Sequence, residues 1–211
     1  PQMLLRLRQH HRYAVIEMGM NHVGEISYLT QLAKPSIALI TNAGAAHIEG
    51  LGSIEAVARA KAEIFEGLDQ QGTAIINADD CYGPLWRKCA GSRPIIDFGL
   101  REKARVSADY STDPLMNTIQ LKLPDGMETI QLQTPGVHNV YNALAAAAAT
   151  IALGIPKESI ASGLECFRGV KGRMQKKLGL HHALLIDDTY NANPESVRAA
   201  LAVLASTKGK K

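Results

Sequence analysis

The first part of the chain alternates between short apolar runs and longer stretches with helical spacing. Two runs rich in β-branched residues, Ser36–Thr41 and Thr73–Asn77, each end in a polar side chain, as expected for buried strands of a parallel sheet. Apolar positions recur at helical intervals over Glu25–Ala33 and Ile54–Leu68, and Ser53 is suited to cap the second of these helices. This order of strands and helices predicts βαβ units and a parallel sheet.

An earlier run, Tyr13–Glu17, has the same pattern and predicts a buried strand with Glu17 at its carboxyl end. In open α/β sheets, ligands bind beyond the carboxyl ends of the strands. Glu17, Thr41 and Asn42 all fall at such ends, so we expect this edge of the sheet to carry the chemistry.

Over Arg93–Thr134 the pattern changes to short alternating strands. The residues Pro124-Asp125-Gly126 are typical of a hairpin turn, and they join two expected strands, Asn117–Leu123 and Met127–Gln133. An alanine-rich segment follows, and its composition predicts a helix over His138–Leu153 that is stopped by the glycine after it.

The last part of the chain has the pattern of a second domain that is only begun. A helix expected over Ser159–Cys166 leads into a glycine-rich basic link, after which Ala183–Asp187 is an expected strand. Asn193-Pro194 suits the N-cap and first residue of a last helix. We therefore expect an α/β fold, with a mostly parallel sheet flanked by helices over residues 1–171 and the start of another domain over residues 172–211.

Composition narrows the classes of function. Hydrophobic residues make up 46% of the chain, and the net charge is +3 with its one basic cluster at Lys208–Lys211, so we expect a folded protein that does not bind nucleic acid. The longest unbroken apolar run, Ala143–Ala149, is too short to cross a bilayer, so no membrane insertion is expected. Three cysteines without Cys-x-x-Cys spacing fit a reducing cytoplasm.

The candidate chemical residues of the first half leave alternatives open when they are considered alone. Glu17 fits either a structural carboxylate or a ligand of a hard cation such as Mg²⁺, which prefers oxygen. His47 is compatible with polar surface, and Lys61 with a solvated helix lysine. We interpret the neighbouring pair Asp79-Asp80 as structural or surface residues.

Polar residues of the second half are compatible with nucleotide binding. The amide of Asn139 or Asn142 can both donate to and accept from an adenine edge, although Asn139 also suits helix capping. Arg173 can bind phosphate through two parallel hydrogen bonds, and Asp188 can accept from ribose hydroxyls. Both are ordinary loop residues if no nucleotide binds.

Taken together, these separated segments resemble the Mur ligase family. They are Glu17–His22, Thr41-Asn42 with His47, Lys61 within Ala60–Glu63, His138-Asn139 with Asn142, Gly172-Arg173 and Asp187–Asn193. Within the family, the chain is most similar to the branch that adds D-alanyl-D-alanine to UDP-MurNAc-tripeptide, a precursor of bacterial peptidoglycan. The resemblance implies the central ATP-binding domain of such a ligase, the first strand and helix of a Rossmann-like C-terminal domain, and a monomeric enzyme.

The resemblance also implies a site for ATP and Mg²⁺. Its metal and catalytic residues would be Glu17, His47 and Lys61, with Lys61 carbamylated by carbon dioxide. Carbamylation needs an uncharged amine, which requires the pKa of a lysine to lie below its usual range.

The remaining implied roles concern nucleotide and substrate. The residues implied to contact adenine are His138, Asn139 and Asn142, and those implied to contact nucleotide when the C-terminal domain closes are Arg173 and Asp188. The residues implied to bind substrate are Tyr190, Asn191 and Asn193.

One motif of ATP-dependent enzymes does not occur in the chain. The phosphate-binding loop G-x-x-x-x-G-K-[ST] is not found, because the pair Gly209-Lys210 is followed by Lys211 and lacks the upstream glycine. We therefore expect the chain to be part of a longer enzyme and to be inactive alone. Two alternatives stay open: another ligase of this type, MurE-like or related to folylpolyglutamate synthase, or a non-catalytic nucleotide-binding module.

Overall fold

The computed structural model of the protein describes residues 2–44, 48–112, 116–190 and 192–207. The chain divides into two units, Pro1–Asp97 and Phe98–Lys211. The α/β class predicted from the sequence is confirmed, whereas the domain boundary predicted between residues 171 and 172 stays a prediction. No helix among the described residues is both long enough and apolar enough to cross a membrane.

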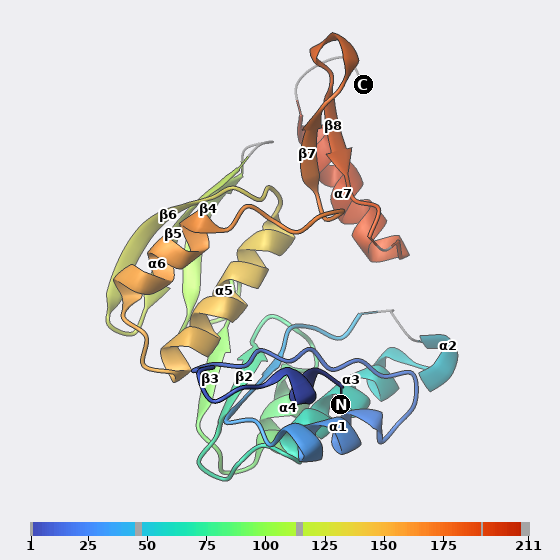
Figure 1. Cartoon of the computed structure of the whole chain (residues 1–211), viewed down its shortest axis with the longest axis vertical. Helices are drawn as coiled ribbons and strands as arrows, with labels where there is room; N and C mark the ends of the chain where they lie inside the picture. The colour runs from blue at the N-terminus through green and yellow to red at the C-terminus, as the bar shows by residue number, and fades with distance from the viewer. Residues whose placement is uncertain (1, 45–47, 113–115, 191, 208–211) are drawn as a thin grey trace. The chain divides into compact units, whose positions relative to one another are not determined.

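A three-stranded sheet forms the centre of the first unit, in the order β1-β2-β3 (Figure 1). Strands β1 and β2 are parallel, as the sequence predicts, and Ile37 lies opposite Thr73. The strands are β1 Ile37–Ile40, β2 Thr73–Asn77 and β3 Ile95–Phe98. The helices are η1 Gln2–Arg6, α1 Glu25–Ala33, α2 Ile48–Leu51, α3 Ile54–Ala62, η2 Glu63–Phe65 and α4 Gly83–Ala90.

The core of the first unit forms around Trp86, whose side chain is fully buried. Its indole Nε1 donates to the Ala58 carbonyl at 3.0 Å, so α4 is fixed to α3 by a hydrogen bond as well as by apolar contact. Phe65 and Ile76 belong to the same apolar cluster, which explains why α3 and α4 bury one side each.

Helix α1 packs closely against η2 and against the residues that follow it. The Thr30 hydroxyl donates to the Ile64 carbonyl at 2.8 Å, and the Glu63 carboxylate accepts from the Gly24 amide at 2.8 Å near the start of α1. A β-carbon placed on Gly67 would lie 2.4 Å from the Thr30 carbonyl oxygen. This contact between main chains is possible only because residue 67 has no side chain.

The predicted strand Tyr13–Glu17 is wrong. No strand is assigned to these residues, Val15 is fully exposed, and the Glu17 side chain is exposed. The run has the composition of a strand, but a strand is stable only when its main chain pairs with a neighbour and one face is covered. Among the described residues, β1 pairs with β2 alone, and Tyr13–Glu17 adds no strand to the sheet.

An antiparallel sheet forms the body of the second unit, in the order β4-β5-β6 (Figure 1). The predicted hairpin is confirmed, with Asn117 opposite Leu132 across its two strands. Helix α5 packs on β4 and β5, and α6 packs on β6. The elements are β4 Ser107–Thr112, β5 Asn117–Leu123, β6 Gly126–Leu132, α5 Val137–Ala152 and α6 Lys157–Cys166.

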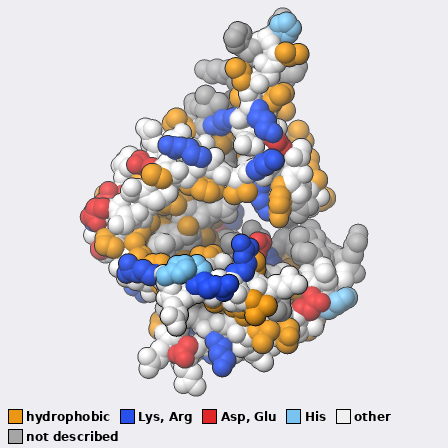
Figure 2. All heavy atoms as spheres, viewed as in Figure 1, with side chains coloured by type: hydrophobic (Ala, Val, Ile, Leu, Met, Phe, Trp, Pro, Cys, Tyr) orange, Lys and Arg blue, Asp and Glu red, His pale blue; other side chains and the backbone are white. Residues whose placement is uncertain are grey.

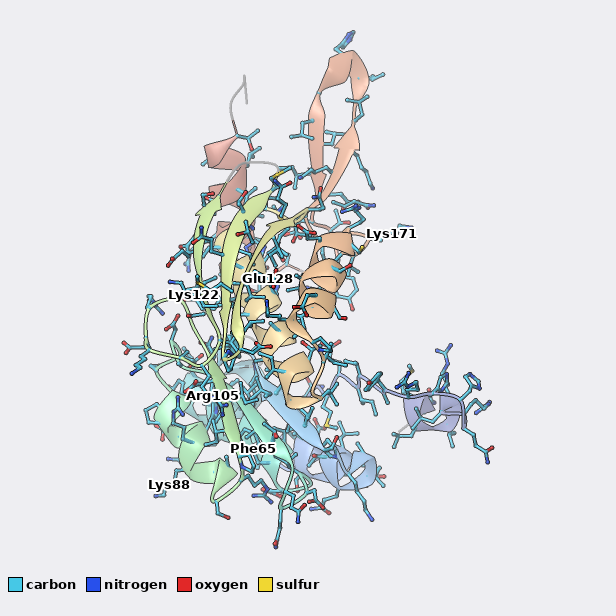
Figure 3. The ribbon with its side chains drawn as sticks, turned by 90° about the vertical axis from the view of Figure 1, so that its left-hand side faces the viewer. Phe65, Lys88, Arg105, Lys122, Glu128 and Lys171 are labelled. Atoms are coloured by element: carbon cyan, nitrogen blue, oxygen red, sulfur yellow. The ribbon has the colours of Figure 1, made fainter. Side chains whose placement is uncertain are left out.

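Side chains of α6 bind groups of β6, the last strand of this sheet. Glu128, labelled on its strand in Figure 3, pairs with Lys157, and the Glu165 carboxylate accepts from the Gln131 amide at 3.1 Å. The pairing with Glu128 is the main reason that the pKa of Lys157 is raised above its usual value. A backbone amide of an edge strand is thus satisfied within the chain.

The last described elements are a hairpin of β7 Gln175–Leu178 and β8 Leu184–Asp187, joined by η3 Leu180–His182, and then α7 Pro194–Ser206. The predicted cap of α7 is confirmed, because the Asn193 side chain accepts from the Ser196 amide. Several apolar side chains of the hairpin are exposed, and Figure 2 shows orange side chains among white and blue ones over this part of the chain; they include Leu178, Leu180 and Leu185.

Candidate functional site

Lys61 lies at the end of β1, although it belongs to α3. The helix is capped by Ser53, whose side chain accepts from the Ala56 amide at 3.1 Å, and it buries Val57, Ala58, Ala60 and Ala62. The Lys61 side chain is half-buried, and its Nζ donates to the Asn42 carbonyl at 2.6 Å. The amine of Lys61 is therefore held at the loop that leaves the carboxyl end of β1.

The same loop is bound by one side chain at the end of β2 and by another that lies just after this strand. The Asn77 side chain donates through Nδ2 to the Thr41 carbonyl at 2.8 Å. The Asp80 carboxylate accepts through Oδ2 from the Ala43 amide at 2.9 Å. The sequence alone does not predict these roles, because it indicates only structural or surface residues at Asp79-Asp80 and the end of a strand at Asn77.

The other two members of the predicted metal set are not brought into a described cluster. Glu17 lies on an irregular segment and is exposed, and His47 lies outside the described residues. Within the described ranges, no three His, Cys, Asp or Glu side chains group together in a way that would hold a metal ion. The metal roles of Glu17, His47 and Lys61 stay predictions.

The Glu25 carboxylate organises the loop between Glu17 and α1. It accepts from the Asn21 amide at 2.6 Å and from the His22 amide at 3.2 Å. These backbone hydrogen bonds, the one from Asn21 above all, lower the pKa of Glu25. Met20 is buried beside them, so the segment is anchored at its end nearer to α1.

A side chain of β5, that of Asn117, holds the turn at the start of α5. Asn117 is fully buried, and its Nδ2 donates to the Thr134 carbonyl at 2.8 Å and to the Gly136 carbonyl at 3.0 Å. Its Oδ1 has no hydrogen-bond partner among the described residues. Gly136 has a φ of 90°, a conformation that glycine adopts at little cost. The buried amide thus sets the turn from which the candidate adenine-contacting residues project.

Those residues differ in how far their polar groups are already used. The Asn139 Nδ2 donates to the Pro135 carbonyl at 2.7 Å and also lies 3.1 Å from the His138 Nε2. Asn142 is exposed, and its Nδ2 donates to the Asn139 Oδ1 at the longer distance of 3.3 Å. Asn139 therefore holds the first turn of the helix, while Asn142 faces solvent.

His138 is linked electrostatically to a residue from the end of the second unit. Burial is the main cause that lowers the pKa of His138, and the negative charge of Asp188 acts in the opposite direction. The Asp188 carboxylate also accepts from the Met174 amide at 3.0 Å. The structure thus places Asp188 where its charge acts on the ionisation of His138; both are predicted nucleotide residues.

Arg173 and Tyr190 stack on one another. The Arg173 guanidinium carbon lies 4.2 Å from the centre of the Tyr190 ring, and the Tyr190 amide donates to the Gly172 carbonyl at 3.0 Å. Such stacking holds the planar cation in one orientation and leaves its edge to donate hydrogen bonds. Asn191 lies outside the described residues, and Asn193 is used as the cap of α7.

The chain is similar to several ligases that share one name. It is 41% identical over 214 residues to the UDP-N-acetylmuramoyl-tripeptide–D-alanyl-D-alanine ligase of Escherichia coli, covering 99% of the chain and 47% of the relative. The ligase of the same name from Haemophilus influenzae is 42% identical over 204 residues, with 97% and 44% covered. The chain thus spans about half the length of the curated relatives it matches.

Solved structures give the same picture. MurF from Acinetobacter baumannii superposes with a TM-score of 0.94 at 42% identity, covering 99% of the chain and 46% of that protein. MurF from Thermotoga maritima, solved in complex with ADP, superposes with a TM-score of 0.78 at 25% identity, with 94% and 47% covered. A family profile described as the Mur ligase middle domain matches residues 1–150. The chain therefore belongs to the Mur ligase family.

Proposed function

We propose that this chain is the nucleotide- and metal-binding part of an ATP-dependent ligase that joins D-alanyl-D-alanine to UDP-MurNAc-tripeptide in the cytoplasm. The observation that carries the proposal is the 41% identity over 99% of the chain to a relative that bears this name. The ADP complex of a MurF with the same fold supports ATP as the nucleotide.

The proposed chemistry proceeds in two steps. A carboxylate oxygen of the tripeptide attacks the γ-phosphorus of ATP, the bond from that phosphorus to ADP breaks, and an acyl phosphate forms. The amine nitrogen of D-alanyl-D-alanine then attacks the acyl carbon, an amide bond forms, phosphate leaves and the nitrogen loses a proton. Reactions of this kind depend on positioning and on stabilising negative charge more than on a protein nucleophile.

The donor chemistry of the predicted metal residues fits Mg²⁺. Glu17 offers carboxylate oxygens, and His47 would add a nitrogen. Lys61 would offer oxygens once its uncharged amine attacks carbon dioxide, forming a nitrogen–carbon bond and releasing one proton. The Lys61 amine donates a hydrogen bond to the Asn42 carbonyl, so the end of the Lys61 side chain lies near the carboxyl end of β1. A bound Mg²⁺ would neutralise charge on the phosphates.

The proposed nucleotide contacts come from the second unit. Asn142 is our candidate for reading the adenine edge, because it is exposed, whereas Asn139 and His138 shape the helix start beneath it. Arg173 would bind phosphate from its stacked position on Tyr190, and Asp188 would accept from ribose. Substrate binding is proposed for Tyr190, Asn191 and Asn193.

The test is phosphate release from ATP by a protein of the relatives' length that contains this chain. We expect release only when Mg²⁺, UDP-MurNAc-tripeptide and D-alanyl-D-alanine are all present. Glu17→Ala should abolish it, whereas Glu55→Ala should not, because Glu55 is an exposed glutamate that pairs with Arg59 on the surface of α3.

Three other outcomes would contradict the proposal. Phosphate release that requires a different amino acid, or a folate as the acid substrate, would indicate another ligase of the family. Nucleotide binding without turnover in a folded protein would indicate a binding module. Full activity of Glu17→Ala would remove this carboxylate from the metal site.

A further inference from the structure

Three consecutive residues after β1 have a backbone group bound by a side chain from elsewhere in the first unit. Asn77 donates to the Thr41 carbonyl at 2.8 Å, Lys61 donates to the Asn42 carbonyl at 2.6 Å, and Asp80 accepts from the Ala43 amide at 2.9 Å. Strand β1 ends at Ile40, so these groups lie beyond the last residue that pairs with β2. Hydrogen bonds with side chains therefore hold this loop in place of the main-chain hydrogen bonds of the sheet.

The side chains of Asn77, at the end of β2, and of Asp80, just after it, are themselves held in place. Asn77 is buried, and its Oδ1 accepts from the Asp79 amide at 2.9 Å while its Nδ2 binds the loop. The Asp80 Oδ1 accepts from the Tyr82 amide at 2.9 Å while its Oδ2 binds Ala43. Both ends of each side chain are thus occupied, which fixes their orientation before any ligand binds.

We propose that Asn77 and Asp80 are positioning residues of the phosphate and metal site, a role that rests on the function proposed above. They hold the loop so that the Asn42 carbonyl meets the Lys61 amine. A carbamylated Lys61 keeps one hydrogen on its nitrogen, and that nitrogen is planar because it is conjugated with the new carboxylate, as a peptide nitrogen is with its carbonyl. With this N–H donated to Asn42, the plane of the two carbamate oxygens is set by the loop.

The substitutions that test this role exchange oxygen for nitrogen without changing size. Asp80→Asn replaces one of the two carboxylate oxygens with an NH2 group, so in the same rotamer either the Ala43 amide or the Tyr82 amide faces a donor in place of its acceptor. Asn77→Asp turns the donor that faces the Thr41 carbonyl into an acceptor that repels it. Asp69→Asn is the matched control, because the Asp69 Oδ1 accepts from the Gln71 amide at 2.8 Å in the same type of turn but has no contact with this loop.

In a protein of the relatives' length, we expect Asp80→Asn and Asn77→Asp to lower kcat, and to raise the Mg²⁺ concentration needed for half-maximal rate, by about 10- to 100-fold. The KM for UDP-MurNAc-tripeptide should stay the same. Asp69→Asn should leave all three quantities unchanged. Wild-type kcat and Mg²⁺ requirement in Asp80→Asn, or an equal loss in Asp69→Asn, would overturn the positioning role.

Two further measurements test the positioning role without relying on ligase turnover. Amide hydrogen exchange at Ala43 should be faster in Asp80→Asn and unchanged in Asp69→Asn, while the Ile75 amide in β2 keeps its protection. The carbamate signal of Lys61 after equilibration with ¹³C-labelled carbon dioxide should weaken in the same variant. Unchanged exchange at Ala43 and an unchanged carbamate signal would overturn the inference. A wild-type protein that shows the carbamate but no ligase turnover would instead overturn the proposed function.

Discussion

At the scale of single residues, the ionisation of His138 depends on two opposed influences. Burial favours the neutral ring and lowers its pKa, whereas the negative charge of Asp188 favours the charged ring. The two residues lie far apart in the sequence, so their interaction is a product of the fold. A neutral ring at the start of α5 is also the form that can both accept and donate a hydrogen bond.

We predict that Asp188→Asn lowers the pKa of His138 further, because it removes the charge that opposes burial. The shift is measured by NMR titration of the ring protons, with Asp187→Asn as the control at the neighbouring position. Because the folded-state pKa of His138 lies below the unfolded value of about 6.5, its contribution to stability is present above that value. It is lost as the pH falls through 6.5 toward the folded pKa. A rise of the pKa in Asp188→Asn would contradict this account.

At the scale of elements, the start of α5 depends on a residue of β5. Asn117 supplies donors to two carbonyls of the turn Thr134–Gly136 from a fully buried position. We predict that Asn117→Ala lowers the free energy of unfolding by roughly 2–4 kcal/mol, because two buried carbonyls lose their partner. Urea denaturation measures the loss. Gln120→Ala on the exposed face of the same strand should change stability little, and an equal loss there would contradict the prediction.

Elements whose signals are local could be predicted from the sequence. Ser53 and Asn193 cap their helices as expected, and the turn at Pro124-Asp125-Gly126 joins β5 to β6. Caps and turns depend on a few neighbouring residues, so their pattern is sufficient. The run Tyr13–Glu17 shows the opposite case, because a strand also requires a partner that its own sequence does not specify.

The candidate site could be predicted only in part for the same reason. The family resemblance indicates Lys61, but the hydrogen bond from its amine to the Asn42 carbonyl follows from the packing of α3 against the sheet. Asn77 and Asp80 carry no sequence signal of their own beyond being polar residues at the end of a strand and just after it. Only the fold shows which loop they bind.

At the scale of the whole molecule, the chain consists of two units, and its single tryptophan belongs to the first. We predict that fluorescence of Trp86 reports the unfolding of Pro1–Asp97, whereas far-UV circular dichroism reports both units. The two urea midpoints should then differ. A variant with Trp86→Phe and Phe167→Trp moves the reporter into the second unit and should show the other midpoint. Coincident curves from all three measurements would mean that the units unfold as one.

The contact between Gly67 and α1 has a consequence for how this sequence can change over time. Any side chain at position 67 would have to occupy the place of the Thr30 main chain, so a substitution there first requires that a whole helix move. A second substitution at position 30 could not relieve this clash, because every residue type has the same main-chain atoms. Codon 67 is expected to accumulate synonymous changes only, even in lineages where the surrounding apolar residues are exchanged freely.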